Sequence, residues 1–360
     1  MDLKKGKNKK EVLAASFSLY FYVVKKIKGR KAEILRQSLK IMNISVIGCG
    51  RWGSFIAWYL NKIGHKLFLY GKNSSKNYQK LLQTRKNDVL YFDENINITS
   101  DLDLIINSSE IIVISIGAQS LRNLMVELAS YDLSGKTLVL CMKGIESFSG
   151  KRLSQVVREF FDEKTQLAIW VGPGHVQDFA RGIPNCMVLD SECEKVKKNL
   201  IELFSSDLIR FYLGTDLIGS EIGAASKNVI GLAAGMLDGI NMSSLKGALM
   251  ARGTREIARL IKAMGGNELS AYGLCHLGDY QATLFSEYSH NRKFGENFIR
   301  GEKYDSLAEG VATATALVKL GKQYQVELPI CETVDNVINK GANPTVTLSN
   351  LFLRSIKAEF

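Results

Sequence analysis

The feature that most constrains the fold is a glycine pattern directly after a short apolar segment. Residues 44–47 read Ile-Ser-Val-Ile, Gly48-Cys49-Gly50-Arg51-Trp52-Gly53 follow, and apolar residues then recur at helical spacing from Phe55 to Ile63. A strand, a GxGxxG turn and a helix in this order are typical of dinucleotide binding, because the glycines allow a tight turn, close approach of the pyrophosphate and close helix packing. The alternative interpretation is a glycine-rich packing turn without a ligand.

Strand and helix patterns continue to alternate through the first half of the chain. Further strands are expected at 66–70, 111–116, 137–141 and 167–171. This alternation predicts an α/β fold whose N-terminal domain is a Rossmann-type parallel sheet with helices on both faces. Ligands bind beyond the carboxyl ends of such strands, so loops 115–120, 142–146 and 172–178 are candidate site loops.

The second half changes to long helical patterns, and no convincing strand is expected after about Asp190. The run from Gly219 to Gly239 is rich in small residues, so we expect a central, buried helix there. The expected segments are a basic leader at 1–41 outside the folded body, a dinucleotide-binding domain at 42–190 and a mainly α-helical substrate and catalytic domain at 191–360. A chain of 360 residues can fill two such domains.

Most of the positive charge lies in the leader. The sequence has 47 Lys and Arg against 36 Asp and Glu, a net charge of +11, and residues 1–41 hold 12 of the basic but only 3 of the acidic residues. The remaining 35 basic and 33 acidic residues nearly cancel. The body therefore gives no reason to expect nucleic acid as a partner, although focused lysines could steer an anionic substrate.

The leader itself leaves three interpretations open. The apolar run from Val12 to Val24 is too short to span a bilayer, which takes about 20 residues, and lysines follow it instead of a cleavage site. One interpretation is that the leader is upstream sequence before a true start at Met42. The other two are a surface helix and a basic anchor on anionic lipid. No stable membrane insertion is expected. Six cysteines without CxxC or Cys/His clusters indicate reduced thiols, no metal site and a cytoplasmic protein.

The end of the second strand bears on the choice of cofactor. An NAD-specific enzyme usually has an acidic residue there for the ribose diol. This chain has Leu69-Tyr70-Gly71-Lys72-Asn73, and the Lys72 cation would attract a 2′-phosphate instead. The cofactor is therefore expected to be NAD or NADP, and the alternative interpretation of Lys72 is a solvated loop lysine.

Two lysines have neighbours that suggest chemistry. Lys227 lies in a helix of small and apolar residues, where an ammonium must be paired or functional because burying an unpaired charge is too costly. Burial also lowers the pKa of a lysine, which suits proton transfer near neutral pH. Lys143 follows a strand and could instead cap a turn. Asp279 and the cluster His290-Asn291-Arg292 fall in an expected interdomain loop, where structural roles are equally open.

Together these motifs resemble the bacterial NAD(P)-dependent sn-glycerol-3-phosphate dehydrogenases over nearly all of residues 43 to 340. The shared motifs are GxGxWG at 48–53, KGIE at 143–146, GP at 172–173, Lys-Asn at 227–228, LGD at 277–279, NRxFG at 291–295, AEG at 308–310 and LPIC at 328–331. The resemblance implies reversible reduction of dihydroxyacetone phosphate to sn-glycerol 3-phosphate, feeding glycerophospholipid synthesis. The alternatives are a related two-domain dehydrogenase with a different small hydroxy or phosphorylated substrate, and a nucleotide sensor without turnover.

The resemblance also implies roles for individual residues. Lys227 would be the general acid and base at the carbonyl oxygen, Lys143 would stabilise negative charge, and Asp279 would bind substrate or polarise the lysine. The implied substrate-binding residues are Lys143, Gly172, Gly174, Asp279, Ser289, His290 and Asn291. The implied cofactor-binding residues are Gly48, Gly50, Arg51, Trp52, Gly53, Lys72, Lys143, Val176, His290 and Glu309. The partner is a small phosphorylated substrate, and a homodimer is left open.

Three places depart from the family pattern. The family usually has Ser or Thr after the GP turn, but this chain has Gly174 followed by His175, which removes an expected hydroxyl. His290 stands where the family has arginine, and residues 115–119 read Ser-Ile-Gly-Ala-Gln where the family has a Val-Pro-Ser turn. Loss of the arginine fork should weaken phosphate binding by about 1.5 to 3 kcal/mol. Either His175 compensates for this loss or the substrate differs.

Overall fold

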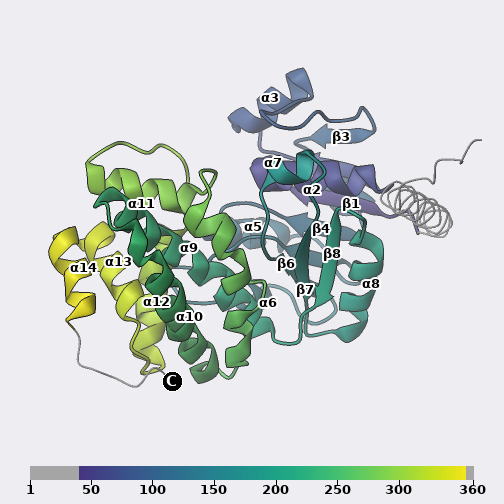
Figure 1. Cartoon of the computed structure of the whole chain (residues 1–360). Helices are drawn as coiled ribbons and strands as arrows, with labels where there is room; N and C mark the ends of the chain where they lie inside the picture. The colour runs from purple at the N-terminus through teal and green to yellow at the C-terminus, as the bar shows by residue number, and fades with distance from the viewer. Residues whose placement is uncertain (1–39, 354–360) are drawn as a thin grey trace, which may run out of the picture. The chain divides into compact units, whose positions relative to one another are not determined.

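The computed structural model describes residues 40–353, and Figure 1 shows their helices and strands. The folded body begins at Met42. The three interpretations of the leader concern residues 1–41, of which residues 1–39 lie outside the described part of the chain. Every helix in residues 40–353 is too short or too polar to span a bilayer.

A single sheet of eight strands organises the first part of the body. The strands are β1 (Asn43–Ile47), β2 (Lys66–Tyr70), β3 (Ile96–Thr99), β4 (Ile111–Ile114), β5 (Thr137–Leu140), β6 (Gln166–Val171), β7 (Asn185–Asp190) and β8 (Ile209–Leu213). They lie in the order β3-β2-β1-β4-β5-β6-β7-β8, and every neighbouring pair is parallel except β6 and β7. The predicted Rossmann-type parallel sheet is confirmed.

Helices cover both faces of this sheet. They are α2 (Arg51–Lys62), α3 (Lys76–Thr84), α4 (Leu102–Ser108), α5 (Leu121–Leu128), α6 (Leu153–Arg158), α7 (Val176–Ala180) and α8 (Glu194–Phe204). Side chains along a strand point alternately to opposite faces, so Val113 of β4 packs in one apolar cluster and Ile112 and Ile114 pack in another. A strand buried on both faces is almost wholly apolar, which is why the sequence pattern located β4 correctly.

Strand β8 corrects the expectation that no strand follows Asp190. It pairs in parallel with β7 and forms one edge of the sheet. Ile209 and Phe211 are buried, whereas Arg210 and Tyr212 between and after them are exposed. A five-residue edge strand with one buried face lacks the continuous apolar run of the inner strands, so its signal is weak. We therefore propose that the first domain ends after Leu213 rather than at Asp190.

The second part of the body consists of helices around α9 (Leu217–Gly239). They are α10 (Lys246–Ala263), α11 (His290–Arg300), α12 (Gly310–Gln323), α13 (Pro329–Lys340) and α14 (Pro344–Phe352). Helices α10 to α13 all pack on α9 (Figure 1), and every residue of α9 from Gly219 to Leu237 is buried. A Cβ on Gly235 would lie 1.9 Å from the Arg292 carbonyl oxygen of α11, so the two backbones touch. The predicted central, buried helix is confirmed.

Candidate active site

The glycine turn between β1 and α2 has the geometry that its sequence predicts. Gly48 has a φ of +121°, and a Cβ there would lie 2.2 Å from the Ser115 carbonyl oxygen. A Cβ on Gly53 would lie 2.1 Å from the carbonyl oxygen of Gly48, so α2 packs directly on the turn. A Cβ on Gly50 would meet no atom within 4 Å, because this residue faces an open cavity. No side chain from residues 40–353 caps α2, which leaves its N-terminal N–H groups available for an anion.

A cavity of about 890 Å³ opens at the carboxyl ends of the strands. The predicted site residues that line it are Gly48, Gly50, Arg51, Trp52, Lys72, Lys143, Gly174, Lys227, Asp279, Ser289, His290, Asn291 and Glu309. All three candidate loops contribute to its wall, through Ser115, Met142 and His175 among others. Residues separated by more than 200 positions in sequence therefore meet around one space.

Three predicted site residues lie behind the cavity wall. Gly53 packs on Gly48, and Val176 is buried at the start of α7. Gly172 acts through its carbonyl oxygen, which accepts a hydrogen bond from Lys143 Nζ at 2.6 Å. For these residues the structure supports a role in shaping the wall, and direct contact with a ligand stays a prediction.

Asp279 brings the ammonium groups of two lysines together. Its Oδ2 atom lies 2.8 Å from Nζ of Lys143 and 2.8 Å from Nζ of Lys227, and Asp279 is only 1% exposed. Lys227 Nζ also donates to Oγ1 of Thr283 at 2.8 Å. The three residues predicted as catalytic come from the loop after β5, from α9 and from the 3-10 turn η4 (Leu277–Asp279). They meet at one carboxylate.

Burial controls the proton affinity of Lys227. Desolvation is the largest effect and lowers the pKa of its ammonium to about 8, the carboxylate of Asp279 opposes this shift, and the charge of Lys143 adds to it. A group with a pKa near the working pH can both give and take a proton. Lys227 is therefore suited to donate a proton to an oxygen atom in the cavity and to remove it in the reverse direction.

Sequence reasoning missed two polar side chains beside the lysines. Thr283 accepts the hydrogen bond from Lys227 described above, and Asn228 Nδ2 donates to the carbonyl oxygen of Lys143 at 2.8 Å. Asn228 could have been found, because the Lys-Asn pair at 227–228 was already a recognised motif. Thr283 had no such signal, since it lies in an irregular π-helical turn, Gln281–Phe285, that no periodic pattern predicts.

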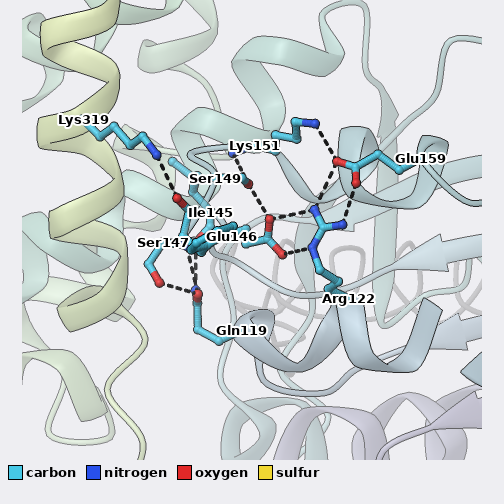
Figure 2. A network of polar contacts seen from close by, with 10 residues as sticks. Gln119, Arg122, Ile145, Glu146, Ser147, Ser149, Lys151, Glu159 and Lys319 are labelled. Carbon is cyan, nitrogen blue, oxygen red and sulfur yellow. Dashed lines mark hydrogen bonds and ion pairs between the residues drawn. The ribbon is translucent and has the colours of Figure 1, made fainter. Parts of the chain in front are cut away.

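An ion-pair network holds the loop that follows Lys143 (Figure 2). The guanidinium of Arg122 donates to both carboxylate oxygens of Glu146, at 2.8 and 2.9 Å, and also pairs with Glu159. Arg122 lowers the pKa of Glu146, so the pair stays charged. The Gln119 amide donates to the Ile145 carbonyl oxygen at 2.8 Å. A loop fixed at this many points can orient Lys143 with little freedom.

The positions that depart from the family pattern also meet at the cavity. Gly174 has a φ of +144°, and a Cβ there would lie 2.3 Å from the Phe179 ring, so the missing hydroxyl has a local structural cause. The buried Nε2 atom of His175 has no hydrogen-bond partner among the described residues. His290 Nδ1 is hydrogen-bonded to the hydroxyl of Tyr304. The cavity wall thus carries two imidazoles, those of His175 and His290, whereas Gly174 supplies no side chain.

Lys72 lies at the exposed rim of the cavity. Its side chain is 64% exposed, and Nζ lies 3.4 Å from Glu127 Oε2. An exposed ion pair of this length is weak, so the ammonium remains available to another anion. Glu309 also lines the cavity, and its Oε1 accepts a hydrogen bond from the Ala118 N–H at 2.9 Å. Among the described residues, no cluster of His, Cys, Asp and Glu side chains could hold a metal ion.

Both halves of the chain match family models. The model of the NAD-dependent glycerol-3-phosphate dehydrogenase N-terminus matches residues 43–197, and that of the C-terminus matches residues 216–349. A glycerol-3-phosphate dehydrogenase [NAD(P)+] of Pelodictyon phaeoclathratiforme is 33% identical over 333 residues, which cover 88% of this chain and 99% of the relative.

Solved structures share the fold. Glycerol-3-phosphate dehydrogenase of Coxiella burnetii has a TM-score of 0.81 at 24% identity and covers 87% of this chain and 99% of its own. D-mandelate dehydrogenase in complex with NADH has a TM-score of 0.60 at 14% identity, covering 83% of this chain and 98% of its own. Other dehydrogenases therefore share this architecture, and the fold alone does not select the substrate.

Proposed function

Because the chain belongs to the NAD-dependent glycerol-3-phosphate dehydrogenase family, we propose that it reduces dihydroxyacetone phosphate reversibly to sn-glycerol 3-phosphate. The observation that carries this proposal is the junction at which Asp279 binds both Lys143 and Lys227 inside the cavity. Beside these two ammonium groups, a carbonyl oxygen would have Lys227 as its proton donor and Lys143 as a nearby positive charge. Retention of this junction argues against a sensor without turnover.

The cavity also fits the nicotinamide dinucleotide that the family uses. The uncapped N-terminus of α2 and the open space at Gly50 suit a pyrophosphate. The indole N–H of Trp52 is buried and has no hydrogen-bond partner in the described part of the chain, and Lys143 Nζ lies 5.9 Å from the ring centre. When bound, the cofactor supplies the hydride. Lys227 gives the carbonyl oxygen its proton, and Lys143 stabilises the negative charge on that oxygen.

The substrate assignment is tested by comparing phosphorylated and unphosphorylated ketones. We expect turnover of dihydroxyacetone phosphate with NADH or NADPH, and a kcat/KM for dihydroxyacetone at least about 100-fold lower, because two or more charge-assisted contacts are lost. Oxidation of NADH or NADPH by the purified protein, followed by its ultraviolet absorbance, measures both rates. Absence of activity on the phosphate would overturn the substrate assignment and favour a related dehydrogenase with another substrate.

Lys72 is expected to determine how well NADPH binds. Lys72→Ala should raise the KM for NADPH about tenfold, since one charge-assisted contact to the 2′-phosphate is lost, and should change the KM for NADH less than about twofold. The control is Lys80→Ala, which removes another exposed, ion-paired lysine that does not line the cavity. Equal effects of Lys72→Ala on both cofactors would show that Lys72 does not contact the 2′-phosphate.

We place this activity in the cytoplasm and in the supply of glycerol 3-phosphate for glycerophospholipids. All six cysteines are free thiols, which is consistent with a reducing compartment. The physiological role rests on family membership alone.

A further inference from the structure

At the start of α11, one ring nitrogen has no hydrogen-bond partner in residues 40–353. Ser289 caps the helix, its Oγ accepting the N–H of Arg292 at 3.3 Å, and Asn291 Oδ1 accepts the N–H of Gly310 at 2.9 Å. His290 lines the cavity with its Nδ1 bonded to the hydroxyl of Tyr304. Among the described residues, His290 Nε2 makes no hydrogen bond. Of the two ring nitrogens of His290, Nε2 is therefore the one that is left for a ligand.

The ring of Tyr304 is held beside His290 by its packing against a neighbouring aromatic side chain. Tyr304 lies between α11 and α12, and its ring packs edge-on against Phe294 of α11, with centroids 6.2 Å apart and planes at 88°. Phe294 is one helical turn after His290, so the same helix carries both neighbours of the tyrosine. Its contact with Phe294 holds the ring beside His290 independently of the hydrogen bond.

We propose that Tyr304 is a positioning residue that keeps a hydrogen on Nε2 of His290, so that this imidazole donates a hydrogen bond to the substrate phosphate. The inference rests on the proposed function, because that function supplies the phosphate. A neutral imidazole has one donor and one acceptor nitrogen, and the partner of one nitrogen decides the state of the other. If Tyr304 donates to Nδ1, Nε2 must carry the hydrogen.

The donor in this pair is the phenol. A phenol is a stronger acid than a neutral imidazole N–H, and burial raises the pKa of Tyr304, so its hydroxyl keeps the proton. Burial, then the charges of Arg51 and Lys293, and then His175 lower the pKa of His290 to about 4, so the ring is neutral before a phosphate binds. A neighbouring dianion would favour protonation of this ring, and Nε2 carries a hydrogen in that state too.

The protein contains a second Tyr–His pair with the opposite arrangement. In the core, His276 Nδ1 donates to the Gly223 carbonyl oxygen at 2.9 Å, so Nε2 accepts from the hydroxyl of Tyr280 at 2.6 Å. His65 has the hydrogen on Nε2, because Nδ1 accepts the N–H of Met42 at 3.3 Å and Nε2 donates to the Leu203 carbonyl oxygen at 2.8 Å. His65 and His276 therefore provide internal references for the two tautomers.

The direct test is nitrogen NMR of histidine-labelled protein at pH 7.5. The chain has only four histidines, so single His→Gln variants assign every ring. We expect His290 to give the Nε2–H pattern of His65 in the native protein and a mixture of tautomers in Tyr304→Phe. An Nδ1–H pattern for His290 in the native protein, or an unchanged pattern in Tyr304→Phe, would overturn the inference. This readout requires no turnover, so it stands apart from the substrate assignment.

A double-mutant cycle tests the functional consequence. Tyr304→Phe should raise the KM for dihydroxyacetone phosphate about fivefold, a typical loss for one hydrogen bond, with kcat within about twofold. The amide NH₂ of glutamine donates without needing a tautomer to be fixed. In a His290→Gln protein, Tyr304→Phe should therefore alter KM less than about 1.5-fold. His290→Arg serves as a second background if the glutamine variant does not fold.

The control is Tyr91→Phe, at an exposed tyrosine outside the cavity, which should change neither constant. If Tyr304→Phe also raises KM about fivefold in the His290 variants, Tyr304 has a general structural role, and the inference is contradicted. If dihydroxyacetone phosphate is not turned over at all, the proposed function fails, whereas the tautomer test still reports on Tyr304.

Discussion

Replacement of Lys227 by alanine is expected to lower kcat/KM for dihydroxyacetone phosphate by at least about 1000-fold, because general acid–base catalysis contributes about 10²- to 10⁴-fold and the substituted site also loses a charge beside the carbonyl oxygen. The fold should survive, since Asp279 keeps its ion pair with Lys143 at 2.8 Å. Steady-state kinetics measure the loss of kcat/KM, and NADH binding followed by fluorescence shows whether the folded cofactor site survives. The dissociation constant for NADH should change less than about twofold.

The matched control for this variant is Lys197→Met. Lys197 is also a buried lysine, with Nζ 2.9 Å from Glu194 and 2.8 Å from the Gly214 carbonyl oxygen, but it does not line the cavity. Its replacement should lower thermal stability and leave kcat/KM of the folded protein within about threefold. Comparable activity losses in the two variants would contradict the assigned role of Lys227.

The pH dependence of kcat/KM should also report the proton transfer by Lys227. Because the pKa of Lys227 is lowered to about 8, the protonated form that reduction needs is lost as pH rises through that value. The reductive kcat/KM should therefore fall about tenfold per pH unit above pH 8. Oxidation of glycerol 3-phosphate needs the neutral amine and should rise up to about pH 8 and then level off. The absence of a break near pH 8 in both directions would assign the proton transfer to another group.

Sequence patterns located the parts of the site that depend on local geometry. Each of the glycines at 48, 50 and 53 meets one steric requirement of the strand–turn–helix unit: a tight turn, close approach of the pyrophosphate, or close packing of helix on strand. Their spacing alone therefore predicts the turn. Lys227 could be selected because an ammonium among small, apolar residues is improbable without a partner. That partner, Asp279, lies 52 positions later, and its distance from Lys227 became known only from the packing of α9 against the η4 turn.

Other parts of the site depend on contacts that no local pattern encodes. Tyr304 belongs to an irregular segment, and its importance follows from the packing of its ring on Phe294 beside His290. The edge strand β8 was missed because three of its five residues are exposed. Gly174 could be recognised as a departure from the family pattern, but the reason for it, the ring of Phe179, required the tertiary structure.

Restoring the family hydroxyl by Gly174→Ser is expected to destabilise the protein by about 3 kcal/mol without lowering the KM for dihydroxyacetone phosphate. A Cβ would lie 2.3 Å from the fully buried Phe179 ring, and overpacking of this kind costs about 1 to 3 kcal/mol. The φ of +144° adds a further cost of about 1 to 2 kcal/mol for any side chain. Chemical denaturation and steady-state kinetics measure the two effects.

A control at Gly182 separates backbone strain from overlap with the ring. Gly182 also has a positive φ, +79°, but a Cβ there would meet no atom within 4 Å, so Gly182→Ser should cost only about 1 kcal/mol. Adding Phe179→Leu to Gly174→Ser should recover part of the loss, because the smaller side chain can make room for the new Cβ. A stable Gly174→Ser protein with a lower KM would mean that this position simply lacks a phosphate ligand. A destabilised Gly174→Ser protein without a lower KM would show that packing against Phe179 excludes a side chain at this position.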